Sequence, residues 1–167
     1  ERTIPSFISL EELIAGAGIE ALLEWLKAEL SNEALEELNN RLIRNFSLDR
    51  MIQTVTILDT EKILRQIEVF FKQLEEHWRR RITNDRKLAL YVHISCLIER
   101  LIRNVPIEQY SGNDFFSSAH EKELQDIKEA FNTIEKVYSV NIPDSELSYV
   151  HDILFEATEW IKEETEF

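Results

Sequence analysis

Apolar residues recur every three or four positions along most of this chain, which is the spacing of an amphipathic α-helix. The clearest case is residues 59–82, where Asp59 or Thr60 is suited to cap the first turn. We expect this helix to pack its apolar face against the core of a helical domain. That face consists of Ile63, Ile67, Phe70, Phe71 and Leu74.

The N-terminal third shows the same pattern in shorter pieces. A short helix is expected to begin at a Ser9 cap and to end at a pair of glycines. Helices over residues 19–30 and 31–46 follow, the second with Ser31 as its cap. Residues 47–58 contain β-branched residues and fewer polar ones, and they are expected to be helical as well.

Three helices are expected in the C-terminal half. The first covers residues 86–104 and is ended by a loop that contains Pro106 and Gly112. The second covers residues 116–140, and the third begins after Pro143, with Asp144 or Ser145 as its cap. The inward stripe of the last helix is Leu147, Val150, Leu154 and Ala157.

These patterns predict an all-α fold: an antiparallel helical bundle of about five long helices, preceded by a short helical extension. We expect residues 1–46 to form the extension or an interdomain segment, and residues 47–167 to form the bundle. With only three glycines and three prolines, the chain has few residues for the turns of a sheet-rich fold. No internal repeat is evident in the sequence.

Composition narrows the functional classes. The 167 residues carry a net charge of -13, which would repel nucleic acid, so direct binding to DNA or RNA is not expected. The single cysteine, Cys96, excludes a disulfide framework and fits a reducing cytoplasm. No apolar run approaches the twenty residues needed to cross a bilayer, so no membrane association is expected.

The charge is unevenly distributed along the chain. Residues 79–103 hold seven basic and two acidic residues, whereas residues 108–167 hold fifteen acidic and four basic ones. The basic segment contains His93, with Arg86 and Arg100 seven positions away on either side. A solvated helix end remains a sufficient explanation for the arginines at 79–81.

His93 lies at the boundary between the core and solvent when residues 86–104 are placed on a helical wheel. The nearby cations Arg86 and Arg100 should disfavour imidazolium and keep the ring neutral, and hence nucleophilic. If the ring accepted a phosphoryl group, these arginines could bind the new dianion. A purely structural His93 remains the alternative from spacing alone.

The other histidines are weaker candidates. His77 precedes the arginines at a helix end and is expected to be structural. His120 lies near a helix N-terminus, where backbone amides could help to bind an anion, so it is the second candidate phosphate acceptor. His151 is expected to be exposed.

Motifs of known catalytic and metal-binding sites are missing. No histidine follows a glutamate by three positions, as di-iron bundles require, and there is no HExxH, glycine-rich phosphate loop or GxSxG. Cys96 and His93 lack a third group that would orient them as a catalytic dyad. We therefore expect no enzyme activity, no cofactor and no metal site.

Two stretches resemble a known family. "LALYVHISCLIERLI" and "FNTIEKVYSVNIPDSELSYVHDIL" are similar to the PTS regulation domain (PRD) of bacterial regulators of sugar-transport operons, in particular to that of sigma-54-dependent activators of the levanase-operon regulator type. The likeness covers residues 47–160 well and the first 46 residues more loosely. The opening "IPSFISLEELIAGAGIEALLEWL" looks like the segment that precedes the last regulatory domain in those activators.

The resemblance implies a homodimeric helical bundle that is phosphorylated on histidine by the phosphocarrier protein HPr or by an enzyme IIB. His93 matches the family's first phosphorylatable histidine, and Arg100 matches the arginine that follows it. The family's second histidine falls seven residues after the glutamate of "Pro-x-x-Glu", here at Ile153, so single-site control is expected. Val92 stands where many members have aspartate.

Overall fold

The computed structural model describes residues 17–54, 58–107 and 119–155, with the backbone alone at residues 17 and 49–54. Within these ranges the chain forms helices and no strand, which confirms the all-α prediction. Most of the expected short helix at Ser9, the loop glycine Gly112 and the stripe residue Ala157 lie outside the described residues. The expected helix stop at the glycine pair is wrong, because Gly18 lies inside a helix that begins at Ala17. The helices are α2 (Ala17–Leu26), α3 (Asn32–Thr54), α4 (Thr60–Trp78), α5 (Asn84–Ile102), α7 (Glu121–Tyr138) and α8 (Asp144–Phe155).

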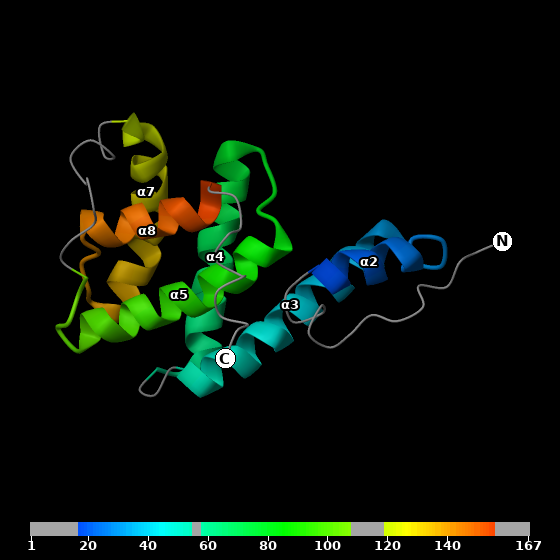
Figure 1. Ribbon diagram of the computed structural model, residues 1–167, viewed down its shortest axis with the longest axis horizontal. Helices are drawn as coiled ribbons and strands as arrows, with labels where there is room; N and C mark the ends of the chain where they lie inside the picture. Colours follow the sequence, from blue (N-terminus) through cyan, green and yellow to red (C-terminus); the bar gives the residue numbers. More distant parts are fainter. Residues whose placement is uncertain (1–16, 55–57, 108–118, 156–167) are drawn as a thin grey trace, which may run out of the picture.

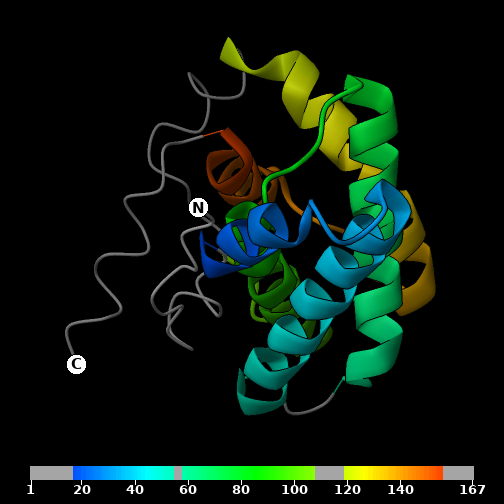
Figure 2. The same cartoon turned by 90° about the vertical axis from the view of Figure 1, so that its right-hand side faces the viewer.

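The helices form a bundle with an appended N-terminal part. In Figure 1, α4 and α7 stand upright side by side, and α5 and α8 run across them. Figure 2 shows α2 and α3 on the side of the bundle where α3 packs against α5 and α4. Helix α5 therefore contacts both the N-terminal helices and α8, which places it at the centre of the molecule.

Helix α4 supplies the middle of the core, as predicted. All five residues of its expected apolar face are buried. Asp59 is the N-cap, because its carboxylate accepts a hydrogen bond of 3.0 Å from the backbone N–H of Lys62. The ring of Phe70 packs against that of Phe131 in α7 at a centroid distance of 4.5 Å. Burial of this face holds α4 and α7 together.

Helix α3 runs without interruption through the expected boundary between residues 46 and 47. Ser31 caps it as predicted, with its hydroxyl 3.2 Å from the backbone N–H of Ala34. The guanidinium of Arg44 contacts the carboxylates of Glu61, at 2.6 Å, and Glu68, both on α4. No glycine or proline interrupts residues 32–54, so the predicted segment 31–46 and the first part of the segment 47–58 form one helix. Residues 55–57 lie outside the described residues, and Leu58 is not helical.

The corners that follow α4 and α7 repeat one another. Glu75 accepts a hydrogen bond from the backbone N–H of Ile82 at 2.9 Å, and Glu135 accepts one from Ile142 at 2.8 Å. Each preceding helix ends at a residue in the left-handed conformation, Arg79 or Ser139. Equivalent residues are 60 positions apart, a repeat that the sequence pattern did not reveal.

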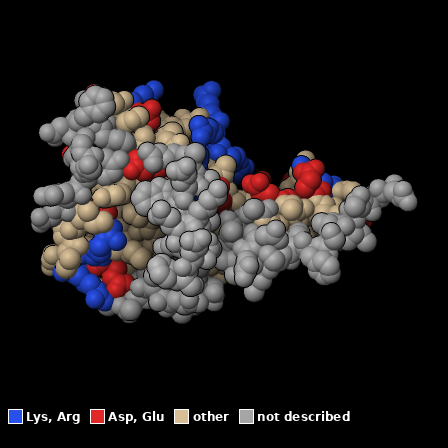
Figure 3. Space-filling view, in the orientation of Figure 1, with Lys and Arg blue, Asp and Glu red and all other residues tan. Residues whose placement is uncertain are grey.

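Arginines at the end of α4 face acidic residues of α3. Figure 3 shows the Lys and Arg side chains gathered there, beside acidic ones. Arg81 forms an ion pair of 2.8 Å with Glu36, and a groove between the helices is lined by side chains of both signs. The basic segment is thus partly neutralised within the fold. No helix among the described residues is both long and apolar enough to cross a membrane.

Candidate functional site

His93 lies in the middle of α5, next to a stripe of apolar residues on the same helix. The stripe residues Leu90, Ile94 and Leu97 are buried, whereas His93 is only partly buried, as expected for a position at the boundary between core and solvent. Its Nε2 atom is nevertheless buried and has no hydrogen-bond partner in the part of the chain that the structure describes. Burial, and then the positive charge of Arg100, lower the pKa of His93 to about 4. The ring is therefore neutral near pH 7.

Arg100 is bound to a buried carboxylate. Its Nη2 atom lies 2.9 Å from Oε2 and 3.0 Å from Oε1 of Glu146, and its Nε atom lies 3.4 Å from Oε1. The Glu146 side chain is 0 % exposed and that of Arg100 is 29 % exposed. Two donors on one carboxylate give a strong, directional contact that connects α5 to the first turn of α8.

The same carboxylate holds the segment that follows α5. The backbone N–H of Ile107 donates to Glu146 Oε1 at 3.2 Å. The hydroxyl of Ser145 donates to the Ile107 carbonyl at 2.6 Å. Glu146 thus joins Arg100, the loop and α8 in one network. In the sequence it appeared only as part of "Pro-x-x-Glu", and nothing there showed that its partner is Arg100.

Arg86 contributes less to the surroundings of His93. It lies in the first turns of α5, and together with Trp78, Ile82 and Leu154 it lines a small cavity. The electrostatic effect on His93 comes from Arg100. Both arginines lie on the same helix as His93, as the heptad spacing predicted. Of the two, Arg100 is the one whose charge affects the pKa of His93.

The remaining histidines fall into two groups. His77 is exposed and its Nε2 atom lies 3.1 Å from Oδ1 of Asp126. His120 and His151 are adjacent, with ring centroids 4.4 Å apart. The expectation that His151 is exposed is wrong: it is 3 % exposed, because α7 packs over this side of α8. The wheel of one helix cannot show such a contact.

Burial also sets the protonation of His151 and Cys96. Burial, and then the neighbouring His120, lower the pKa of His151 to about 4, while Glu123 acts in the opposite direction. Burial raises the pKa of the Cys96 thiol, which favours the structural interpretation of this residue. The 60-residue offset between the two corners relates His93 to Ile153, the position at which the family's second histidine was expected to be absent.

The family to which the chain belongs follows from comparison with known proteins. The described residues form a helical module with a neutral histidine at the edge of its core, beside an ion-paired arginine. The PRD domain family model matches residues 61–158, which is more than half of the chain, so the chain belongs to this family. PRD domains of transcriptional regulators are regulatory. The resemblance of the two quoted stretches to the PRD is confirmed, whereas the sigma-54-dependent type of the regulator is not.

One relative gives the setting in which such a domain occurs. The chain is 27 % identical over 154 residues to the transcriptional regulatory protein DagR of Salmonella typhimurium (strain 14028s / SGSC 2262). The match covers 89 % of this chain and 16 % of that protein. The chain therefore spans about a sixth of the length of this relative. No solved structure matches the chain significantly.

Proposed function

We propose that this chain is the phosphorylation-controlled regulatory domain of a bacterial transcriptional activator of sugar-transport genes, with His93 as the phosphate acceptor. The observation that carries the proposal is the neutral imidazole of His93 beside Arg100. Membership of the PRD family and the similarity to a transcriptional regulatory protein support it. The domain acts as an acceptor and is not itself an enzyme.

The chemistry needs a nucleophilic ring nitrogen and a cation for the product. A neutral imidazole has a lone pair with which it can attack the phosphoryl group of the donor, whose own bond to phosphorus breaks. The product carries a dianionic phosphoryl group on His93. Arg100 and, more weakly, Arg86 would support this charge through charge-assisted hydrogen bonds. Because Nε2 is buried, access to this atom requires a local opening around α5.

The Arg100–Glu146 pair suggests how phosphorylation changes the structure. A phosphoryl group on His93 would compete with Glu146 for Arg100, because a guanidinium has only a limited number of donors. A weakened Glu146 contact would loosen α8 and the segment at Ile107 from α5. We infer that this changes the packing of two domains in a homodimer, and thereby the output of the full-length regulator.

The partners in this proposal are the phosphocarrier protein HPr, a sugar-specific enzyme IIB, or both, acting in the cytoplasm. The regulator is proposed to be of the sigma-54-dependent type, with residues 1–46 leading into an antiparallel bundle of long helices at 47–167. His120 is retained as a second candidate acceptor. The alternative is a helical dimerisation or protein-interaction module in which His93 is purely structural.

The test is phosphoryl transfer to the purified domain. The domain is incubated separately with phosphorylated HPr and with a phosphorylated enzyme IIB, and its intact mass is then measured before and after acid treatment. We expect one acid-labile adduct in the wild type and none in His93→Ala. His77→Ala is the matched control, because His77 is an exposed histidine in the same bundle.

Each result has a defined meaning. An adduct in the wild type and in His77→Ala, but not in folded His93→Ala, supports the proposal and identifies the donor. An adduct that persists in His93→Ala moves the acceptor to another residue, with His120 tested next. If neither donor modifies the wild type, the alternative of a structural His93 is favoured.

A further inference from the structure

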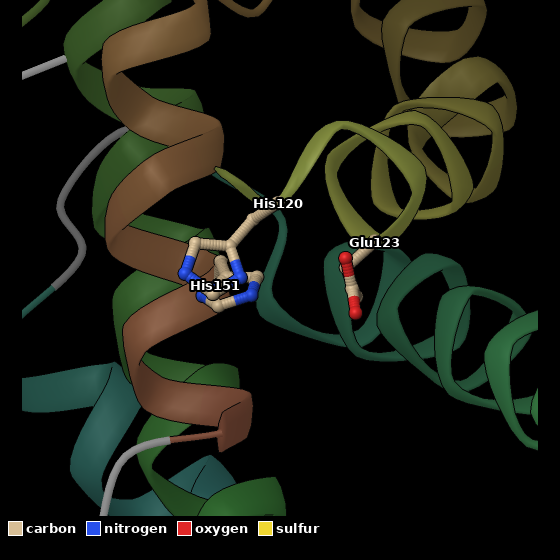
Figure 4. Close-up of side chains that lie close together, drawn as sticks. All are labelled: His120, Glu123 and His151. Atoms are coloured by element: carbon tan, nitrogen blue, oxygen red, sulfur yellow. The ribbon is translucent and has the colours of Figure 1, made fainter. Parts of the chain in front are cut away.

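A second cluster of side chains lies away from His93, where the start of α7 meets α8. It consists of His120, Glu123 and His151, which Figure 4 shows close together. One ligand atom from each residue lies within 4.8 Å of the others. His120 is the N-cap residue of α7, Glu123 lies one turn later, and His151 comes from the middle of α8. Two helices therefore contribute to one small cluster.

The cluster has the chemical composition of a transition-metal site. Two imidazoles and one carboxylate are the protein ligands of several three-ligand zinc sites, which leave a fourth position for water or another ligand. Imidazole ligands favour zinc and its late transition-metal neighbours over magnesium or calcium, which prefer oxygen ligands only. The donor set thus selects the class of cation.

The distances allow the three groups to close on an ion. Zinc–nitrogen bonds of about 2.0 Å put the ligand atoms of a tetrahedral site about 3.3 Å apart. The ligand atoms here lie within 4.8 Å of one another, so each pair would have to approach by at most about 1.5 Å on binding an ion. His120 and Glu123 are three positions apart on one helix, so both can point to the same side.

A neighbouring carboxylate is placed where it would orient His151 once an ion is bound. Oδ1 of Asp152 lies 3.9 Å from Nδ1 of His151, and both side chains are buried. Histidines that bind metals usually direct their second ring nitrogen at a carboxylate or carbonyl group, which orients the ring. A separation of 3.9 Å is too long for a hydrogen bond, so Asp152 would orient the ring only after His151 turns Nδ1 towards it on binding an ion through Nε2.

We propose that His120, Glu123 and His151 form a binding site for one zinc ion, or a similar divalent transition metal, that fastens the N-terminus of α7 to α8. This role is separate from phosphorylation of His93, so either proposal can fail without the other. A cation on His120 would also keep that residue from accepting phosphate. The site does not follow the di-iron pattern, in which a histidine follows a glutamate by three positions, because His120 precedes Glu123 and His151 comes from another helix.

The test uses the full chain, freed of any histidine tag and treated with chelator. Zinc chloride is titrated in competition with a chromophoric chelator, and cobalt chloride is added separately to record the visible absorption of a tetrahedral cobalt site. We expect one zinc ion per chain, a tetrahedral cobalt spectrum and a raised melting temperature with zinc, but no such rise with magnesium chloride.

The variants are His120→Ala and Glu123→Gln, since neither side chain is fully buried. Loss of a direct ligand should weaken zinc binding more than about 10-fold, the lower end of the effect seen for residues around metal ligands. His77→Ala is the matched control, because it removes a histidine that also faces a carboxylate of α7, Asp126. It should leave the zinc affinity and the cobalt spectrum unchanged.

Two outcomes would overturn the proposal. One is no zinc binding by the folded wild type. The other is equal zinc affinity in the wild type, His120→Ala and Glu123→Gln, which would mean adventitious surface binding. A cobalt spectrum that is lost in His120→Ala but kept in His77→Ala supports the site independently of affinity.

Discussion

Helix α8 makes two contacts of opposite character. Towards α5 it presents Glu146, whose buried carboxylate is held by Arg100 at 2.9 Å. Towards α7 it presents His151, whose buried imidazole lies against His120 and near Glu123. The first contact is an ion pair with further hydrogen bonds, and the second is a cluster of metal-ligating groups.

The difference shows that the neighbouring group determines whether a buried polar side chain forms an ion pair or stays neutral. Burial of a carboxylate without a cation would lower the free energy of unfolding. Arg100 offsets that effect by donating from both Nε and Nη2 to Glu146. A buried imidazole can stay neutral instead, and burial holds the pKa values of both His151 and His93 at about 4. The ion pair of Glu146 and the burial of His151 therefore both depend on contacts between helices.

The two contacts should differ most in stability when the acidic residue of each, Glu146 or Glu123, is replaced. Glu146→Gln leaves the guanidinium of Arg100 without its carboxylate, and we expect a loss of about 3 kcal/mol in the free energy of unfolding. Glu123→Gln removes a less buried carboxylate and, without metal, should cost less than about 1 kcal/mol. Urea unfolding of both variants in chelator measures the difference. Equal losses would contradict the distinction.

A pH series should show a smaller effect at His93. Its pKa in the folded chain is about 4, against 6.5 ordinarily, so the unfolded chain binds more protons between these values. The contribution of the neutral ring to stability is complete above pH 6.5 and is lost as the pH falls towards 4. Between pH 7 and 5 the wild type should lose about 1–2 kcal/mol more than His93→Gln.

Urea unfolding of the wild type and His93→Gln at several pH values in this range is the measurement. The two curves of stability against pH should converge as the pH falls. Parallel curves would mean that His93 does not change its proton affinity on folding, and would remove the argument for a neutral acceptor.

The smallest effect is expected at Arg86, and it tests the unequal roles of the two arginines. Arg86→Ala should shorten the lifetime of the phosphorylated domain less than about fivefold, as for a weak surface ion pair. Arg100→Lys keeps the positive charge but loses the planar guanidinium group that can bind phosphate through two donors, so it should shorten the lifetime more than Arg86→Ala does. Intact mass followed over time at neutral pH measures both. If Arg86→Ala shortened the lifetime more than Arg100→Lys, Arg86 would be the stronger support of the phosphoryl group, contrary to the proposal.

Much of the fold could be predicted from local sequence patterns. The apolar face of α4 and the caps Asp59 and Ser31 are confirmed, because each depends on residues within one or two turns of the same helix. The equivalence of the corners at Glu75 and Glu135 was missed, since it depends on single hydrogen bonds within otherwise dissimilar segments.

The sequence by itself determined the helical class, the family and the position of His93 at the edge of a helical face. Only the tertiary structure decided that Arg100 binds Glu146, and that His151 is buried against His120. The physical reason is range. Helical periodicity is a property of neighbouring residues, whereas these pairs join residues 46 and 31 positions apart, whose contact depends on how whole helices pack.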